Sequence, residues 1–301
     1  MAGRNNQHPE RKQITDAMAD HQETLIKIPK PKSDVAPRVS KHTLPVEEQN
    51  RIKDDEIQIE ICTVDDALAV AEGLYTCFPD SFWDKMEPPA LRDADQATRA
   101  KRLAKRLSPS FHLPEMKYIK AVYKPTGQIV GVAGWMLPGM PIHNVWRRTA
   151  TEFFGFKEMM GWSDADIEEM WRGIDLEAWE KQIGGNDKIR ADVLGDEPHW
   201  FLAPLMTLPE FQGRGIATKL MKWAIEQADQ KGGQPMYLES APTARNVYMR
   251  FGFEPIGEAN FLRRGPDGRK GKLWRELVAQ EKGEEVGVHV VEKEVDDGEL
   301  R

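Results

Sequence analysis

The residues with the clearest chemical meaning lie in the segment 207–220, which reads TLPEFQGRGIATKL. An apolar run from Trp200 to Met206 precedes this segment, and apolar residues at helical spacing follow it. This order predicts a strand, then a turn that contains Gly213 and Gly215, then a helix. The first N–H groups of such a helix have no acceptor within the helix, and with the helix dipole they favour an anion. Because glycine carries no side chain that would keep a phosphate from the backbone, the segment predicts a diphosphate site.

The spacing of the small residues excludes two common phosphate-binding loops. The P-loop needs two glycines five residues apart, followed at once by lysine and a hydroxyl residue, and this segment does not have that order. The dinucleotide-binding fingerprint needs a third small residue three positions after the second glycine, where this chain has Thr218. A third pattern, Q/R-x-x-G-x-G/A, is met by Gln212, Gly215 and Ala217.

This third pattern resembles the acetyl-CoA loop of the GNAT family of N-acetyltransferases, and a second motif supports the resemblance. Residues 236–253 read MYLESAPTARNVYMRFGF, which is similar to a strand of that family, its following helix and the family's Tyr-x-x-x-Gly-Phe ending at Tyr248 and Phe253. The two motifs occur in the family's order, and their separation fits one helix and one turn. The resemblance extends over residues 57–277 and is sharp from 200 to 257.

The resemblance implies acetyl-CoA as the acetyl donor and assigns contacts to it. In the family, two neighbouring strands separate, and the pantetheine arm of the coenzyme pairs with the backbone of the first strand. The matching positions here are Leu205, Met206 and Thr207. The expected diphosphate contacts are Gln212, Gly213, Arg214, Gly215, Ile216, Ala217 and Thr218. Pro204 lacks an N–H, which predicts a bulge or an edge in the strand that it interrupts. No metal is expected.

The same resemblance assigns the catalytic groups. Tyr248 matches the family tyrosine that faces the thioester sulfur, so we expect it to protonate the departing thiolate as a general acid. Glu239 ends the second strand and is the first choice as general base, with Glu210 and His199 as alternatives. Many members carry an asparagine seven residues before the tyrosine, but this chain has Ala241 there, so one usual coenzyme contact is in doubt.

The elements that must position these residues can be predicted from periodicity. The alternating residues 57–61 predict the first strand, and helices are predicted at 67–75 and 94–107. The second of these helices is strongly basic; a solvated face is the favoured interpretation, and capture of an acidic acceptor or a coenzyme phosphate is the alternative. Strands at 116–123 and 129–137 flank a turn and predict a hairpin, and a helix is expected at 244–251. Residues 257–263 and 272–277 predict a closing hairpin.

Residues 141–197 are an insertion by the standard of the family, and they are unusually aromatic. Most of their apolar side chains are expected to pack on the sheet, and a few to wall the acceptor site. The predicted fold is therefore the α/β fold of GNAT acyl-CoA N-acyltransferases. It has a mixed central sheet, helices on both faces and a helical insertion between the third and fourth strands.

The ends of the chain differ in composition from its middle. Residues 1–56 contain no aromatic residue and several prolines, which predicts a disordered extension, and residues 278–301 form an acidic tail after the 57–277 domain. The net charge of −7 and the lack of a basic stripe argue against nucleic acid, and no apolar run is long enough for a membrane span. The two cysteines, Cys62 and Cys77, fit a reducing compartment, so we expect a cytoplasmic protein, with the nucleus as a second location.

These expectations predict a direct-transfer N-acetyltransferase that uses acetyl-CoA and acts on a primary amine of a small molecule. Two alternatives stay open at this point. One is a protein or peptide N-acetyltransferase, and the other is a sensor or scaffold that binds acyl-CoA without turnover. The sequence predicts neither the identity of the amine nor the oligomeric state.

Overall fold

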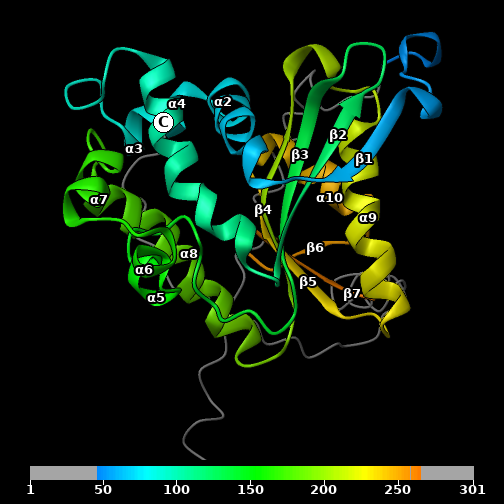
Figure 1. Cartoon of the computed structure of the whole chain (residues 1–301). Coiled ribbons are helices and arrows are strands. Elements are labelled where there is room, and N and C mark those ends of the chain that lie inside the picture. Colours follow the sequence, from blue (N-terminus) through cyan, green and yellow to red (C-terminus); the bar gives the residue numbers. More distant parts are fainter. Residues whose placement is uncertain (1–45, 258, 266–301) are drawn as a thin grey trace, which may run out of the picture. The chain divides into compact units, whose positions relative to one another are not determined.

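The computed structural model describes residues 46–257 and 259–265, and its centre is a mixed sheet of seven strands in the order β1-β2-β3-β4-β5-β7-β6 (Figure 1). The strands are β1 (Ile57–Ile61), β2 (Met116–Tyr123), β3 (Gln128–Met136), β4 (Trp200–Thr207), β5 (Pro235–Glu239), β6 (Glu254–Pro255) and β7 (Asn260–Arg264). Strands β4 and β5 are parallel, and every other neighbouring pair is antiparallel. The mixed α/β sheet predicted from the sequence is confirmed.

The helices of the first half of the chain lie on one side of the sheet, with α2 in contact with β3 and β4. These are α2 (Ala67–Cys77), α3 (Asp80–Met86) and α4 (Gln96–Leu107). Helix α4 begins where the carboxylate of Asp95 accepts hydrogen bonds from the N–H groups of Ala97 and Thr98, which are donors without an acceptor in the helix. Helices at 67–75 and 94–107 are thus confirmed to within two residues, whereas α3 was not predicted.

The opposite face is covered by α9 (Ile216–Gln230) and α10 (Arg245–Met249). The apolar side of α9 belongs to one buried cluster with alternate residues of the strands, among them Trp200, Leu202, Met236 and Leu238. The intervening residues Phe201 and Tyr237 belong to the cluster on the other face. This alternation is what a sheet buried on both sides requires. Helices on both faces, as predicted, are shown.

Residues 141–197 are largely helical, with α5 (Ala150–Phe153), α6 (Phe156–Met160), α7 (Asp164–Met170) and α8 (Leu176–Leu194). Helix α8 is held against the start of this region because the indole N–H of Trp179 donates to the carbonyl of Trp146 over 2.7 Å. The helical content agrees with the sequence analysis. That these residues are an insertion relative to the family stays a prediction.

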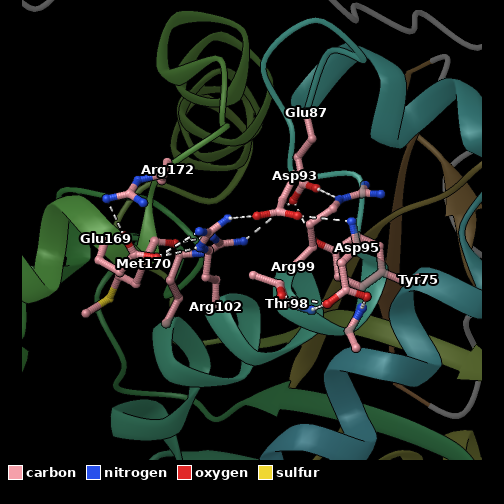
Figure 2. A network of polar contacts seen from close by, with 12 residues as sticks. Tyr75, Glu87, Asp93, Asp95, Thr98, Arg99, Arg102, Glu169, Met170 and Arg172 are labelled. Carbon is pink, nitrogen blue, oxygen red and sulfur yellow. Dashed lines mark hydrogen bonds and ion pairs between the residues drawn. The ribbon is translucent and has the colours of Figure 1, made fainter.

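The basic helix α4 differs from both interpretations offered for it. Its basic side chains form ion pairs within the protein: Arg99 with Glu87 at 2.6 Å, Arg102 with Glu169 at 2.8 Å and Lys105 with Asp166 at 2.8 Å. Figure 2 shows Arg99 and Arg102 of α4 beside their carboxylate partners. The hydroxyl of Tyr75 of α2 donates a hydrogen bond to Glu87, the partner of Arg99. The favoured interpretation of a solvated face was wrong for these three residues, because Glu87, which follows α3, and two carboxylates of α7 pair with them.

The C-terminal part of the sheet also differs from the prediction. Strand β7 pairs with β5 and with the short β6, so the strand that closes this edge comes from residues 254–255. The predicted partner at 272–277 and the acidic tail at 278–301 lie outside the described residues, as does most of the predicted extension 1–56. Residues 46–56 are described and include the 3-10 helices η2 (Glu48–Asn50) and η3 (Asp54–Glu56).

Candidate active site

Strands β4 and β5 separate partway along their length. Their parallel pairing covers three positions, from Trp200 opposite Met236 to Leu202 opposite Leu238. Strand β4 then continues to Thr207, paired with β3 on its other side only (Figure 1). The backbone of Leu205, Met206 and Thr207 therefore has an open edge on the side of β5. An open strand edge of this kind can accept an extended ligand as an additional strand.

Pro204 lies two residues after the last residue of β4 that pairs with β5, and a bulge or an edge was predicted at this position. The register between β3 and β4 shifts between Ala133 and Trp135, which confirms a bulge, and the peptide bond before Pro204 is cis. A Cβ on Gly134 would lie 2.5 Å from the carbonyl oxygen of Ala203. Glycine at this position therefore allows β3 and β4 to approach each other closely at the bulge.

The predicted diphosphate loop joins β4 to α9. Gly213 and Gly215 both have left-handed backbone angles, with φ of 72° and 93°, and Gly215 is the residue that caps α9. No side chain of the described residues forms a capping hydrogen bond with the start of this helix. The N–H groups of the first turn, which include those of Ala217 and Thr218, thus have no acceptor within the helix. N–H groups in this situation can bind an anion, and the anion site at this helix start stays a prediction.

Three contacts fix the loop on the protein. The side chain of Gln212 donates to the carbonyl of Thr207 over 2.9 Å, so it ties the loop back to the end of β4. The N–H of Val46 donates to the carbonyl of Gly213 over 3.1 Å. Lys219, in the first turns of α9, forms an ion pair of 2.5 Å with Asp54. The loop is held in its conformation from both sides.

The end of β4 carries a buried polar atom that has no partner among the described residues. The hydroxyl oxygen of Thr207 makes no hydrogen bond, whereas the carbonyl of the same residue accepts from Gln212 and, over 3.3 Å, from the thiol of Cys77 at the end of α2. A buried hydroxyl without a partner costs free energy, so it marks a position where a ligand could supply one. Burial is also the main reason that the pKa of Cys77 is raised to about 12, which keeps it a neutral thiol.

Glu239 ends β5 on the side where the two strands have separated. One of its carboxyl oxygens is buried without a hydrogen-bond partner in the described part of the chain. Burial raises the pKa of this carboxyl to about 8; the Arg190 guanidinium opposes that rise, and the Asp187 carboxylate adds to it. A carboxyl group with a pKa near neutrality is suited to accept and release a proton at physiological pH.

Tyr248 lies on α10 and is buried beside Phe253 and Phe261. Burial raises the pKa of its hydroxyl above the ordinary value, and the neighbouring Glu239 carboxylate raises it further. The phenol therefore stays protonated at neutral pH and is available as a hydrogen-bond donor. The structure thus places Tyr248 and Glu239 within electrostatic reach of each other.

The two alternative bases lie in less suitable places. His199 precedes β4, at the end where β4 and β5 are still paired, and its Nδ1 donates to the carbonyl of Glu197 over 2.7 Å. Burial lowers the pKa of His199. Glu210 lies in the 3-10 helix η6 (Pro209–Phe211) beyond the end of β4, where it is exposed to solvent. Of the three candidates, the carboxylate of Glu239 is the one buried beside the open edge.

Sequence reasoning missed a buried ion pair on α8 that lies near Glu239. Arg190 and Asp187 are 1% and 4% exposed, and Nη2 of the arginine lies 2.9 Å from Oδ1 of the aspartate. Both occur on the buried side of α8, among Trp179, Ile183 and Leu194. The spacing of these five positions is that of one helix face, so two charged residues on an otherwise apolar stripe were a signal in the sequence.

Comparison with known proteins agrees with the geometry. Residues 176–253 match the model of the acetyltransferase (GNAT) family, and this span runs from α8 through the loop to the end of the Tyr248 motif. Acetyltransferase Atu2258 of Agrobacterium fabrum is 37% identical over 68 residues, which are 22% of this chain and 50% of that protein. Residues 176–253 are thus similar to the acetyltransferase (GNAT) family. The chain spans about half the length of the curated relative that it matches.

Solved structures of acetyltransferases are also similar to this chain. One is the histone acetyltransferase HPA2 and related acetyltransferase of Corynebacterium glutamicum, with a TM-score of 0.43, 17% identity and coverage of 69% of this chain and 94% of that one. Another is a GNAT family acetyltransferase of Brucella melitensis in complex with acetyl-CoA, with a TM-score of 0.36, 15% identity and coverage of 69% and 87%.

No group of three or more His, Cys, Asp or Glu side chains within 46–257 and 259–265 is arranged to hold a metal ion. In the same part of the chain, none of the helices has the length and apolar character needed to cross a membrane.

Proposed function

We propose that this chain is an acetyl-CoA-dependent N-acetyltransferase that transfers the acetyl group directly to a primary amine of a small molecule. One observation carries the proposal: the pairing of β4 with β5 ends at Leu202 and Leu238, while β4 continues to Thr207 and leads into α9, whose N-cap residue, Gly215, has no side chain to cap the helix. The open strand edge offers N–H donors and C=O acceptors to an amide-containing arm. The helix start that follows it offers N–H donors to a diphosphate.

The residues fit the coenzyme on grounds independent of the family match. The orphaned hydroxyl of Thr207 lies on the open stretch of β4, and the N–H groups at residues 215–218 have no side-chain cap. A Cβ on Gly215 would have nothing within 4 Å, so the space beside the helix start is open to a ligand. Leu205, Met206 and Thr207 would hold the pantetheine arm, and residues 212–218 the diphosphate. When bound, acetyl-CoA supplies a thioester whose acetyl group is activated toward amines.

The buried acid and base divide the proton transfers between them. The carboxylate of Glu239 takes a proton from the acceptor, either from the ammonium before attack or from the neutral amine as it attacks. The hydroxyl of Tyr248 gives a proton to the sulfur that leaves. A main-chain N–H on the open edge of β4 stabilises the negative charge that develops on the carbonyl oxygen. Because a carboxyl with a pKa of about 8 is half ionised near that pH, the rate should rise as pH increases through this region.

The position of residues 141–197 favours a small acceptor over a protein chain. Cys77 contacts the end of β4, and the next residue, Phe78, has its ring 6.4 Å from that of Trp146. The aromatic region thus reaches the element that borders the open edge. Side chains in this place would enclose an acceptor, whereas a peptide needs an open groove.

The test is a free-thiol release assay with acetyl-CoA and a panel of small amines, with peptides as a second panel. Tyr248→Phe should lower kcat by about 100-fold or more while the Kd for acetyl-CoA, measured by calorimetry, changes little. Turnover on peptides alone would support a protein acetyltransferase instead. Saturable binding of acetyl-CoA without turnover on either panel would support a sensor, and no binding at all would refute the proposal.

A further inference from the structure

The ion pair between Asp187 and Arg190 has features that a purely structural pair does not need. The arginine is fully enclosed, with its Cζ 3.7 Å above the ring of Phe201, yet its Nε–H has no acceptor in the described part of the chain. A buried donor without an acceptor is costly, and replacing such pairs by apolar side chains often leaves a protein no less stable.

The unsatisfied donor of Arg190 lies on the face of the sheet that also presents Glu239. Phe201 of β4 is the register partner of Tyr237 of β5, and Glu239 follows Tyr237 by two residues, so it points to the same face. Arg190 and Glu239 act on each other electrostatically, and each has one buried polar atom without a partner. One of these atoms is a donor, and the other is an acceptor.

We propose that Asp187 and Arg190 are positioning residues for Glu239: the guanidinium orients the carboxylate and favours its ionised form, and Asp187 limits how strongly it does so. The pair comes from α8, which also belongs to the aromatic region 141–197. Its kinetic consequence depends on the proposed function, but its electrostatic consequence for Glu239 does not.

The charges that face Glu239 come from three elements. Arg190 and Asp187 lie on α8, Tyr237 lies on β5 itself, and Tyr248 lies on α10. Asn260 of β7 is opposite Glu239 in the register and does not titrate. The two tyrosines are neutral at physiological pH because burial raises the pKa of each hydroxyl. Burial is the main reason that the pKa of Glu239 is raised, and the two charged residues of α8 shift that pKa further in opposite directions.

Two charge-removing substitutions should move the pKa of Glu239 in opposite directions. Arg190→Gln removes the charge that favours the carboxylate, so the pKa of Glu239 should rise by about one unit or more. Asp187→Asn removes a like charge and leaves the guanidinium without its nearest anion, so the same pKa should fall by a similar amount. The carboxyl titration is followed by NMR in protein labelled with ¹³C at glutamate, and the signal is assigned by its loss in Glu239→Gln.

Glu180→Gln is the matched control, because Glu180 pairs with Arg147 in the same network but does not act on Glu239. It should leave the titration unchanged. Arg190→Lys keeps the charge and should restore most of the wild-type pKa, and the double variant Asp187→Asn/Arg190→Gln covers the case in which one unpaired charge prevents folding. If both single variants fold and the pKa of Glu239 stays unchanged, or moves in the same direction in both, the inference is overturned.

The pH dependence of kcat/KM gives the second readout. Its lower limb should move to higher pH in Arg190→Gln and to lower pH in Asp187→Asn, in step with the NMR titration. Absence of turnover in the wild-type protein would count against the proposed function and leave the NMR test standing. If the enzyme turns over and the lower limb of its kcat/KM profile stays at the same pH while the pKa of Glu239 measured by NMR shifts, Glu239 is not the group that sets this limb.

Discussion

Replacing Gly215 by alanine tests whether the backbone at the start of α9 binds the coenzyme. Gly215 has a φ of 93°, and a Cβ there would meet nothing within 4 Å. The substitution therefore adds no steric clash, and its cost is that of a left-handed conformation for a residue with a side chain. That cost is about 1–2 kcal/mol. In the absence of ligand the loop can relax to another conformation, but binding requires it to return.

The relaxation should appear as weaker binding. A free-energy cost of about 1–2 kcal/mol corresponds to a Kd for coenzyme A that is about 5- to 30-fold higher. Isothermal titration calorimetry with coenzyme A measures this value directly, and urea unfolding of the same samples shows whether the fold is intact.

Gly139→Ala is the matched control for this experiment. Gly139 is also exposed, has a φ of 100° and has open space where a Cβ would lie, but it follows β3 at the end of the strand away from the loop. Its substitution should cost a similar amount of stability and leave the Kd unchanged. Equal affinity in Gly215→Ala and wild type, or an equal loss in both variants, would refute the assignment of the diphosphate to this helix start.

Three further results are expected. Folding raises the pKa of Glu239 from 4.5 to about 8, so the folded state favours the protonated carboxyl. The stability gained from this preference is fully present below pH 4.5 and is lost as pH rises through 8. The unfolding free energy of Glu239→Gln should therefore increase relative to that of the wild type between these pH values, and a constant difference would contradict the burial of this carboxyl. Gly134→Ala places a Cβ 2.5 Å from the carbonyl oxygen of Ala203 and should lower stability by about 1–3 kcal/mol in urea unfolding, whereas a neutral effect would mean that the bulge in β4 is pliable. Gly185→Ala, inside α8 with nothing within 4 Å of its new Cβ, should raise stability by about 0.5–1 kcal/mol in the same assay, and a loss would indicate a contact on that side of the helix.

The parts of the site that depend on local sequence were predictable. The conformation of the loop at 213–215 follows from glycine spacing after a strand, and the hairpin of β2 and β3 follows from two strand patterns around a turn. The open edge of β4 came only from the family resemblance, because a strand pattern does not say where its neighbour stops pairing.

Contacts between distant elements could not be predicted in the same way. The basic face of α4 is covered because Glu87 and Glu169 come from elements whose placement depends on the whole fold. The approach of Arg190 to Glu239 likewise joins residues almost fifty positions apart. The sequence did contain a trace of it, since two charges interrupt the apolar face of α8.

The contacts of Val46 with Gly213 and of Asp54 with Lys219 bear on how the protein should be shortened for laboratory work. A version trimmed to begin at the first strand, residue 57, would remove the donor to the Gly213 carbonyl and the counterion of Lys219 in one cut. Measurements on such a fragment would describe an altered coenzyme loop. Truncations intended to preserve native affinity should therefore start ahead of residue 46.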